Sequence, residues 1–361
     1  MRILVLANSD IGLFKFRKEL LEELILQGNH IYISLPNGEY IQSLVEMGCI
    51  FINTEVDRRG LNPVIDGKLI VKYHKIIKKI NPDLVITYTV KPNVYGGFIC
   101  RFTKIRHAAN ITGLGTAFQR EGLLKNFIIR LYKISFKKAR VVFFENDNDK
   151  RIFIDNGIVK SEKTYKLNGA GVNLEEYQFC SYPQIDSEIH FLFIGRVMKE
   201  KGIDELLAAA VKIKKKYIGA VFDIVGPFED NYEQITENHQ KNGYINYYGY
   251  QKDVRSYIEK SHCFVLPSYH EGMANTLLEC GAMGRPLITS DIHGCKEAVL
   301  HEVNGYLVKV SDIDDLCAKI EKFINIPYSE KVKMGMASRD LIVNNFDKRD
   351  IVNRTIEQLL K

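Results

Sequence analysis

The chain has 361 residues, a formal net charge of +6 and a hydrophobic content of 46%. This length is natural for two domains, and no stretch approaches the ~20 consecutive apolar residues that cross a bilayer, so we expect a globular protein without a signal peptide. Seven scattered cysteines without a Cys-x-x-Cys pair predict reduced thiols in a cytosolic protein and argue against a structural zinc site.

Short apolar strands alternate with amphipathic helices along most of the chain, which predicts parallel α/β units. In the first half we expect strands at 3–7, 30–34, 50–53, 84–87, 108–111 and 141–144, with a helical pattern such as 14–26 between them. The periodicity lapses around 164–188, where we place a linker. A second series follows at 189–194, 221–225, 245–248, 263–266, 286–289 and 306–308.

Two Rossmann-like domains facing across a central cleft are therefore expected. We predict an N-terminal acceptor domain at 1–168 and a C-terminal nucleotide-sugar-binding domain at 186–345. A final helix at 346–361 is expected to pack back toward the N-terminal domain. In such folds ligands lie beyond the carboxyl ends of the strands, and the motifs below all fall at strand-to-helix junctions.

The segment Gly195-Arg196-Val197-Met198-Lys199-Glu200-Lys201-Gly202 joins a buried strand to a helix. Glycine lets the backbone approach an anion, and Arg196 and Lys201 supply cations for a diphosphate. The plainer alternative is a solvated loop that caps a helix. Asp147-Asn148-Asp149 and Asp312-Ile313-Asp314 match an Asp-x-Asp metal motif, but both precede helical patterns, where acidic residues act as caps.

The segment Glu271-Gly272-Met273-Ala274-Asn275-Thr276-Leu277-Leu278-Glu279 places two carboxylates eight positions apart at the start of a predicted helix. Carboxylates form strong hydrogen bonds to vicinal hydroxyls, and unpaired N–H groups of 272–276 can add anion contacts. The alternative is a helix whose first turn is acidic because of its dipole. The basic and acidic segments together indicate one ligand, a nucleotide-sugar.

These two segments, about 70 residues apart, resemble family 4 of the retaining glycosyltransferases, which have the GT-B fold. Ser9-Asp10-Ile11-Gly12, Tyr88-Thr89-Val90-Lys91-Pro92-Asn93 and Thr112-Gly113-Leu114-Gly115 resemble the bacterial subgroup that extends undecaprenyl-diphosphate-linked glycans. That subgroup includes N,N'-diacetylbacillosaminyl-diphospho-undecaprenol N-acetylgalactosaminyltransferases and capsule and O-antigen glycosyltransferases.

The resemblance implies a role for each matching residue. Arg196 and Lys201 would hold the donor diphosphate, Glu279 the ribose and Glu271 the donor sugar, as nucleophile or as stabiliser. Gly12 would approach the phosphates from the other domain, and Tyr248-Gly249-Tyr250 would flank the nucleobase through the backbone. The family needs no metal or other cofactor. Relatives often carry histidine where Val90 stands, so the identity of any general base stays open.

The positive charge is concentrated in the first 150 residues. Between Arg120 and Arg140 cations alternate with apolar residues at helical spacing, which predicts a helix that binds a membrane surface. An ordinary half-buried helix is the alternative. Lys15, Arg17 and Lys91 are predicted to bind an acceptor diphosphate, and Asn93 and Gly113 join them through the subgroup's segments. Nucleic acid fits the charge, but the chain has no nucleic-acid-binding motif.

The sequence thus predicts a metal-independent transferase at the inner face of the cell membrane. It would move a hexose or N-acetylhexosamine from a UDP-sugar to an undecaprenyl-diphosphate-linked saccharide. The alternatives are a UDP-N-acetylglucosamine 2-epimerase of the same fold and a non-catalytic polyanion-binding protein.

Overall fold

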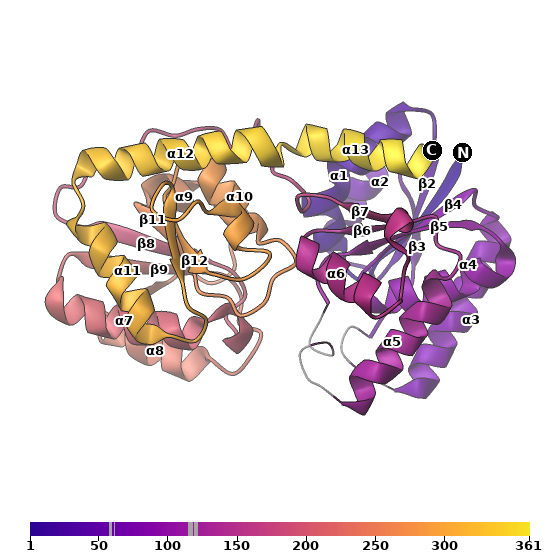
Figure 1. Ribbon diagram of the computed structural model, residues 1–361, viewed down its shortest axis with the longest axis horizontal. Helices are drawn as coiled ribbons and strands as arrows, with labels where there is room; N and C mark the ends of the chain where they lie inside the picture. Colours follow the sequence, from indigo (N-terminus) through magenta and orange to yellow (C-terminus); the bar gives the residue numbers. More distant parts are fainter. Residues whose placement is uncertain (58–59, 61, 115–117, 119–121) are drawn as a thin grey trace. The chain divides into compact units, whose positions relative to one another are not determined.

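The computed structural model describes residues 1–57, 60, 62–114, 118 and 122–361. It contains two compact units, Met1–Ala170 with Lys348–Lys361 (unit 1) and Gly171–Asp347 (unit 2). Figure 1 shows that each unit has its own sheet with helices around it. The two units are described separately below.

Unit 1 is built on a parallel seven-stranded sheet of order β3-β2-β1-β4-β5-β6-β7. Its strands are β1 Arg2–Leu6, β2 His30–Leu35, β3 Ile50–Asn53, β4 Leu84–Tyr88, β5 Arg106–Ile111, β6 Val141–Phe144 and β7 Thr164–Lys166. The helices are α1 Asp10–Leu26, α2 Ile41–Glu46, α3 Pro63–Ile80, the π-helix η1 Pro92–Gly96, α4 Gly97–Thr103, α5 Leu123–Phe136, α6 Asp147–Asp155 and the 3-10 turn η3 Ser161–Lys163.

Strand β1 shows why these segments form a central parallel sheet. Ile3 and Val5 are buried in one hydrophobic cluster, whereas Leu4 and Leu6 are buried in another. Side chains alternate between the two faces of a strand, so both faces of this sheet are covered. The continuous apolar run in the sequence follows from burial on both sides.

The C-terminal helix α13, Lys348–Leu360, belongs to unit 1. It packs against α1, and Ile351, Ile356 and Leu359 join the hydrophobic cluster of the sheet. Lys348 at the start of the helix pairs with Glu19 at 3.3 Å. The chain therefore returns to unit 1 after completing unit 2.

Unit 2 is built on a parallel six-stranded sheet of order β10-β9-β8-β11-β12-β13. Its strands are β8 Ile189–Ile194, β9 Ala220–Val225, β10 Asn246–Tyr247, β11 Cys263–Leu266, β12 Leu287–Ser290 and β13 Gly305–Val308. The helices are the 3-10 turn η4 Lys199–Lys201, α7 Ile203–Lys216, α8 Glu233–Lys241, α9 Arg255–Lys260, α10 Asn275–Ala282, the 3-10 turn η5 Lys296–Ala298, α11 Ile313–Asn325 and α12 Tyr328–Phe346.

The order of these strands places a topological switch between β8 and β11. The chain leaves β8 toward β9 on one side and later returns through β11 on the other side. Loops that follow such a pair of strands diverge and leave a crevice at the carboxyl edge of the sheet. Both sequence motifs of unit 2 lie in these loops.

The segment 164–188 is only partly the irregular linker that the sequence predicts. Thr164–Lys166 forms β7 at the edge of the first sheet, and the boundary between the units falls at Ala170 and Gly171. Further along, the fully buried guanidinium of Arg285 donates hydrogen bonds to the carbonyl oxygens of Cys180 and Ser181. The linker is thus held against unit 2 by a residue that follows it by about 100 positions.

Among the described residues, every helix is too short or too polar to traverse a bilayer. All seven cysteines are free thiols, and six of them are buried.

Candidate active site

Three loops meet backbone to backbone at the carboxyl edge of the sheet in unit 2. Gly195 follows β8, Gly226 follows β9, and the amide of Gly226 donates to the carbonyl oxygen of Gly249 after β10 at 2.8 Å. A Cβ on Gly226 would lie 1.8 Å from the carbonyl oxygen of Gly195, and the φ of Gly226 is +146°. Only glycine fits there, because a side chain would overlap the neighbouring backbone.

The predicted diphosphate loop begins in this row of loops. Arg196 is about half exposed and its guanidinium lies 3.3 Å from the carboxylate of Glu229, which belongs to the loop after β9. The amide of Val197 donates to Pro227, and the amide of Glu229 donates back to Val197. These bonds fix the backbone that carries Arg196.

The loop ends in η4 and in Gly202, which caps the N-terminus of α7 with a φ of +71°. A Cβ at Gly202 would lie 2.0 Å from the carbonyl oxygen of Pro267, which follows β11. The loops after β8 and β11 are therefore in direct contact. Gly202 thus allows a close approach of protein backbone, whereas the predicted approach of an anion to this loop stays a prediction.

Lys201 and Glu271 form an ion pair across the topological switch. Their Nζ and Oε1 atoms lie 2.5 Å apart, and the side chains are 19% and 11% exposed. Ser268 donates a hydrogen bond of 2.8 Å to the same carboxylate oxygen. The structure thus brings together Lys201, which is predicted to bind the donor diphosphate, and Glu271, which is predicted to bind the donor sugar. The two residues are 70 positions apart in sequence.

Helix α10 begins at Asn275, with Ala274 as its N-cap residue. The expectation that the amides of 272–276 are all unpaired is wrong for Ala274, whose N–H donates to the carbonyl oxygen of Gly294 at 2.8 Å. Met273 and Ala274 are buried, and Gly272 is buried beside them. Asn275 Oδ1 is buried without a protein hydrogen-bond partner, as expected for a group that awaits a ligand.

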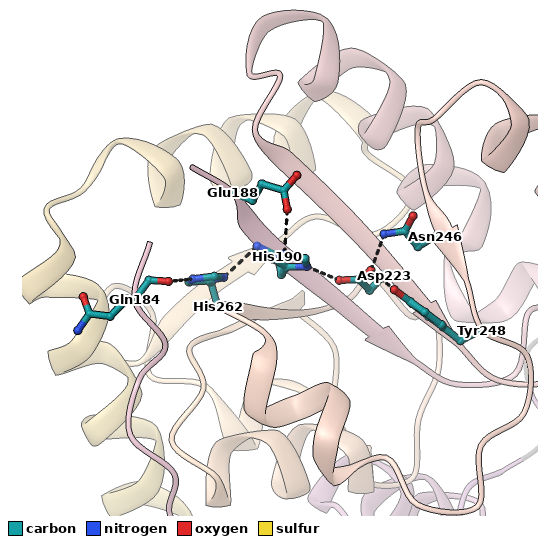
Figure 2. Close-up of polar contacts among 7 residues, drawn as sticks. All are labelled: Gln184, Glu188, His190, Asp223, Asn246, Tyr248 and His262. Atoms are coloured by element: carbon teal, nitrogen blue, oxygen red, sulfur yellow. Dashed lines mark hydrogen bonds and ion pairs between the residues drawn. The ribbon is translucent and has the colours of Figure 1, made fainter. Parts of the chain in front are cut away.

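Two further predicted donor-binding residues, Glu279 and Tyr248, also lie in unit 2. Glu279 is in the second turn of α10, and its charge together with burial raises the pKa of Tyr177. Thr276 is half-buried in the first turn of the same helix. Tyr248 follows β10, and its hydroxyl donates to Asp223 at 3.1 Å (Figure 2).

The predicted acceptor residues of unit 1 lie at the carboxyl ends of its strands, and two of the cations are paired. Arg17 lies 2.7 Å from Glu145 and its guanidinium is 5.2 Å from the centre of the Tyr88 ring. Lys91 lies 2.6 Å from Asp66 on α3.

The other predicted residues of unit 1 are held by local contacts. The amide of Gly12 donates to Ser9 Oγ and so caps α1, and the carbonyl oxygen of Lys15 accepts a hydrogen bond from Lys348. Asn93 is 1% exposed. Both ends of its amide are engaged, because Oδ1 accepts from Thr87 and Nδ2 donates to the carbonyl oxygen of Asn110. Gly113 follows β5 with a φ of +130°.

The Asp-x-Asp segments act locally as helix starts in the described structure. Asn146 caps the helix that carries Asp147 and Asp149, and Asp312 caps α11 by accepting from the amide of Asp315. Within the described ranges no three His, Cys, Asp or Glu side chains come together as a metal-binding group.

Two residues of the predicted membrane segment, Arg120 and Glu121, lie outside the described residues. The described part is α5, whose exposed residues include Phe127, Arg130, Lys133 and Ile134. Phe98 and Phe102 on the neighbouring α4 are exposed as well.

Sequence reasoning missed the carboxylates that hold the predicted cations, namely Glu229, Asp66 and Glu145, and it missed Ser268 and Gly294 as supports of the Glu271 loop. Glu229, Ser268 and Gly294 follow predicted strands at the same sheet edge. That position was the available signal, because ligand-binding loops of parallel sheets lie there.

Comparison with known proteins identifies the class of enzyme to which this fold belongs. Residues 2–146 match the family described as Glycosyl transferase 4-like, and residues 178–340 match the family described as Glycosyl transferases group 1. The chain is a glycosyltransferase that belongs to these families and has the GT-B fold. The predictions of fold and enzyme class are confirmed.

The chain is similar to several bacterial enzymes over most of its length. It is 29% identical to N,N'-diacetylbacillosaminyl-diphospho-undecaprenol alpha-1,3-N-acetylgalactosaminyltransferase of Campylobacter jejuni, over 93% of this chain and 92% of that protein. It is 27% identical to UDP-Gal:alpha-D-GlcNAc-diphosphoundecaprenol alpha-1,3-galactosyltransferase of Escherichia coli, over 80% of this chain and 78% of that protein. The structure of Anabaena Alr3699/HepE in complex with UDP and glucose superposes with a TM-score of 0.81 at 16% identity, with all of both chains covered.

Proposed function

We propose that this glycosyltransferase moves a hexose or N-acetylhexosamine from a UDP-sugar to an undecaprenyl-diphosphate-linked saccharide, with retention of anomeric configuration and without a metal ion. The observation that carries the proposal is the Lys201–Glu271 pair at the topological switch of unit 2. It puts a cation and a carboxylate at the place where doubly wound sheets bind nucleotides.

The assignment of donor-binding residues follows from the charges around this pair. A departing nucleoside diphosphate develops negative charge that cations can stabilise in place of a metal. Arg196 offers a planar fork for phosphate oxygens and Lys201 offers a compact charge. Glu271 would then exchange part of its contact with Lys201 for a hydroxyl of the donor sugar, and Glu279 would bind the ribose. Asn275 Oδ1, buried without a partner, is a further acceptor for a donor hydroxyl.

The names of the relatives support the choice of acceptor. The proteins from Campylobacter jejuni and Escherichia coli are both named for acceptors that carry a diphosphoundecaprenol group. Arg17 and Lys91 are the cations that we assign to an acceptor diphosphate, with Lys15 beside Arg17 on α1. Each of the first two is held by a carboxylate, so an incoming phosphate would compete with Glu145 and Asp66 for them.

A lipid-linked acceptor requires contact with a membrane, and we assign that contact to α5 and α4. Phe127 is 57% exposed and Phe102 is 65% exposed, and cations of α5 such as Arg130 and Lys133 lie on the exposed surface near them. Exposed aromatic rings enter the headgroup region while cations contact anionic lipids, at about 1 kcal/mol per cation. The enzyme would thereby sit at the inner face of the cell membrane.

The proposal is tested by replacing Arg196 and Glu279 separately with alanine. Both variants should lose transfer from UDP-sugars to a diphospholipid-linked saccharide while keeping the wild-type unfolding midpoint. Lys199→Ala is the matched control, because Lys199 is an exposed cation of the same loop that we assign no ligand contact. Transfer at the wild-type rate in both test variants would remove the assignment.

The same assay separates the remaining alternatives. Activity should be unchanged in excess EDTA, because no step is assigned to a metal. Incubation with UDP-N-acetylglucosamine alone should leave that nucleotide-sugar unaltered. An isomerised nucleotide-sugar would instead identify a 2-epimerase.

A further inference from the structure

A polar network lies across three strands of unit 2, away from the Lys201–Glu271 pair. It consists of residues from β8, β9 and β10 and from the segments before β8, after β10 and before β11, which Figure 2 labels as Gln184, Glu188, His190, Asp223, Asn246, Tyr248 and His262. We call these seven residues the His190 network. None of them contacts the predicted diphosphate cations, yet one of them, Tyr248, opens the segment assigned to the nucleobase.

Asp223 is the centre of the network. It lies in β9 and is 8% exposed. Its Oδ2 pairs with His190 Nδ1 at 2.7 Å, while its Oδ1 accepts from Asn246 Nδ2 at 2.9 Å and from the Tyr248 hydroxyl at 3.1 Å. A buried carboxylate is costly unless it is paired and hydrogen-bonded, so these three donors define its position.

His190 lies between two carboxylates. Nδ1 faces Asp223 and Nε2 lies 3.5 Å from Glu188. Its hydrogen bond to Asp223, opposed by burial and aided by Glu188, raises the pKa of His190.

His262 contacts the network from the turn before β11. Its ring stacks on His190, its Nδ1 accepts from the His190 amide, and its Nε2 contacts the carbonyl oxygen of Gln184. Burial lowers the pKa of His262 to about 4, with smaller effects of the cations His190, Arg285 and Lys331. The pKa values of the two rings are thus shifted in opposite directions, upward for His190 and downward for His262.

Tyr248 connects this network to the row of loops at the donor site. Its amide donates to Ile224 at 3.0 Å, and the carbonyl oxygen of the next residue, Gly249, accepts from Gly226. Gly226 in turn touches Gly195 at the start of the diphosphate loop. The backbone of Tyr248 and Gly249 is thus fixed by the sheet on one side, and the Tyr248 side chain is fixed by Asp223 on the other.

We propose that Asp223 and His190 are positioning residues for the nucleobase, because they hold the Tyr248–Gly249–Tyr250 segment through the Tyr248 hydroxyl. This inference rests on the proposed function, which places a UDP-sugar at this edge. Donor affinity then depends on the charge of His190. Loss of the proton leaves Asp223 buried without its cation and weakens the arrangement around Tyr248.

The test compares UDP with pyrophosphate as ligands of the full-length protein, using isothermal titration calorimetry. Tyr248→Phe removes one hydroxyl and keeps the ring, and Asp223→Asn removes the charge. Both substitutions should lower the affinity for UDP about tenfold, which is the effect expected from the loss of a hydrogen bond to a charged group. Both should leave the affinity for pyrophosphate unchanged. Tyr244→Phe, a tyrosine of the turn before β10, is the control and should bind both ligands as the wild type does.

The pH dependence of the affinity for UDP is a second measurement, which a purely structural role of these residues would not change. As the pH rises through the titration of His190, the wild-type affinity for UDP should fall, and Tyr248→Phe should lack this fall. Equal weakening of UDP and pyrophosphate, or wild-type UDP affinity in both test variants, would overturn the inference while leaving the proposed function intact. A wild-type protein that binds no UDP would overturn the proposed function itself.

Discussion

Replacing Lys201 with alanine should reduce both the activity and the stability of unit 2. The Glu271 carboxylate is 11% exposed, and without Lys201 it keeps the hydrogen bond from Ser268 but loses its cation. Breaking a fully buried pair costs 3–5 kcal/mol, and because this pair is partly solvated we expect about 2 kcal/mol. For a domain of this size that is a fall in unfolding midpoint of about 4–8 °C. Without Lys201 the negative charge that develops on the leaving diphosphate is less stabilised, so kcat/KM should fall by about 10²–10³.

The double variant Lys201→Ala, Glu271→Gln separates these two effects. Neutralising the unpaired carboxylate should restore most of the unfolding midpoint, whereas activity should stay low because the cation is still missing. Lys212→Ala is the control, since the Lys212–Asp314 pair has a similar distance but is largely exposed, so its loss should leave the midpoint unchanged. Differential scanning calorimetry and initial rates measure both quantities. A Lys201→Ala protein with wild-type rates, or with a midpoint that the second substitution does not recover, would refute this reasoning.

Three further outcomes are expected. Gly226→Val should lower the unfolding midpoint and abolish the thermal shift given by UDP, because its Cβ would overlap the Gly195 carbonyl; a normal shift with UDP would contradict this. Burial lowers the pKa of His107 and of His262 from 6.5 to about 4, so between these values the unfolded chain binds more protons. Urea midpoints should therefore fall as pH drops from about 6.5 to 4, and constant midpoints would count against both assignments. Phe127→Glu should weaken sedimentation with anionic vesicles while the exposed Ile218→Glu does not, and equal binding by both would exclude α5 from the membrane contact.

Nearly all of the strands could be predicted, because most of them are buried on both faces and therefore appear as continuous apolar runs. Strand β8 has the bounds that the sequence predicts, and β11 does as well. The exception is β7, whose three residues are only half-buried at the sheet edge and so leave no apolar run to recognise. The region was therefore interpreted as linker throughout.

The positions of segments 195–202 and 271–279 at strand ends could also be predicted, since their glycines and charges are local patterns that follow predicted strands. Their partners could not. Glu229 pairs with Arg196 because β9 lies beside β8, and Asp66 pairs with Lys91 because α3 packs near η1. These contacts depend on the order of elements in space, which the sequence does not list. Asn93 is the opposite case. Its motif predicted contact with the acceptor, whereas its side chain is buried in the fold.

The position of the glycines supports the proposal that this site binds a diphosphate without a metal ion. Gly202, Gly226 and Gly294 each lie where a Cβ would overlap the backbone of a neighbouring loop, so the loops after β8, β9, β11 and β12 support one another directly. A cation held on such a backbone needs little rearrangement when charge develops on the leaving group, and preorganised charge is what makes electrostatic catalysis effective. Lys201 stays oriented before the donor arrives because Glu271 holds it across the switch. In the proposed mechanism this ion pair, which folding supplies in advance, would orient Lys201 toward the leaving group without a metal ion.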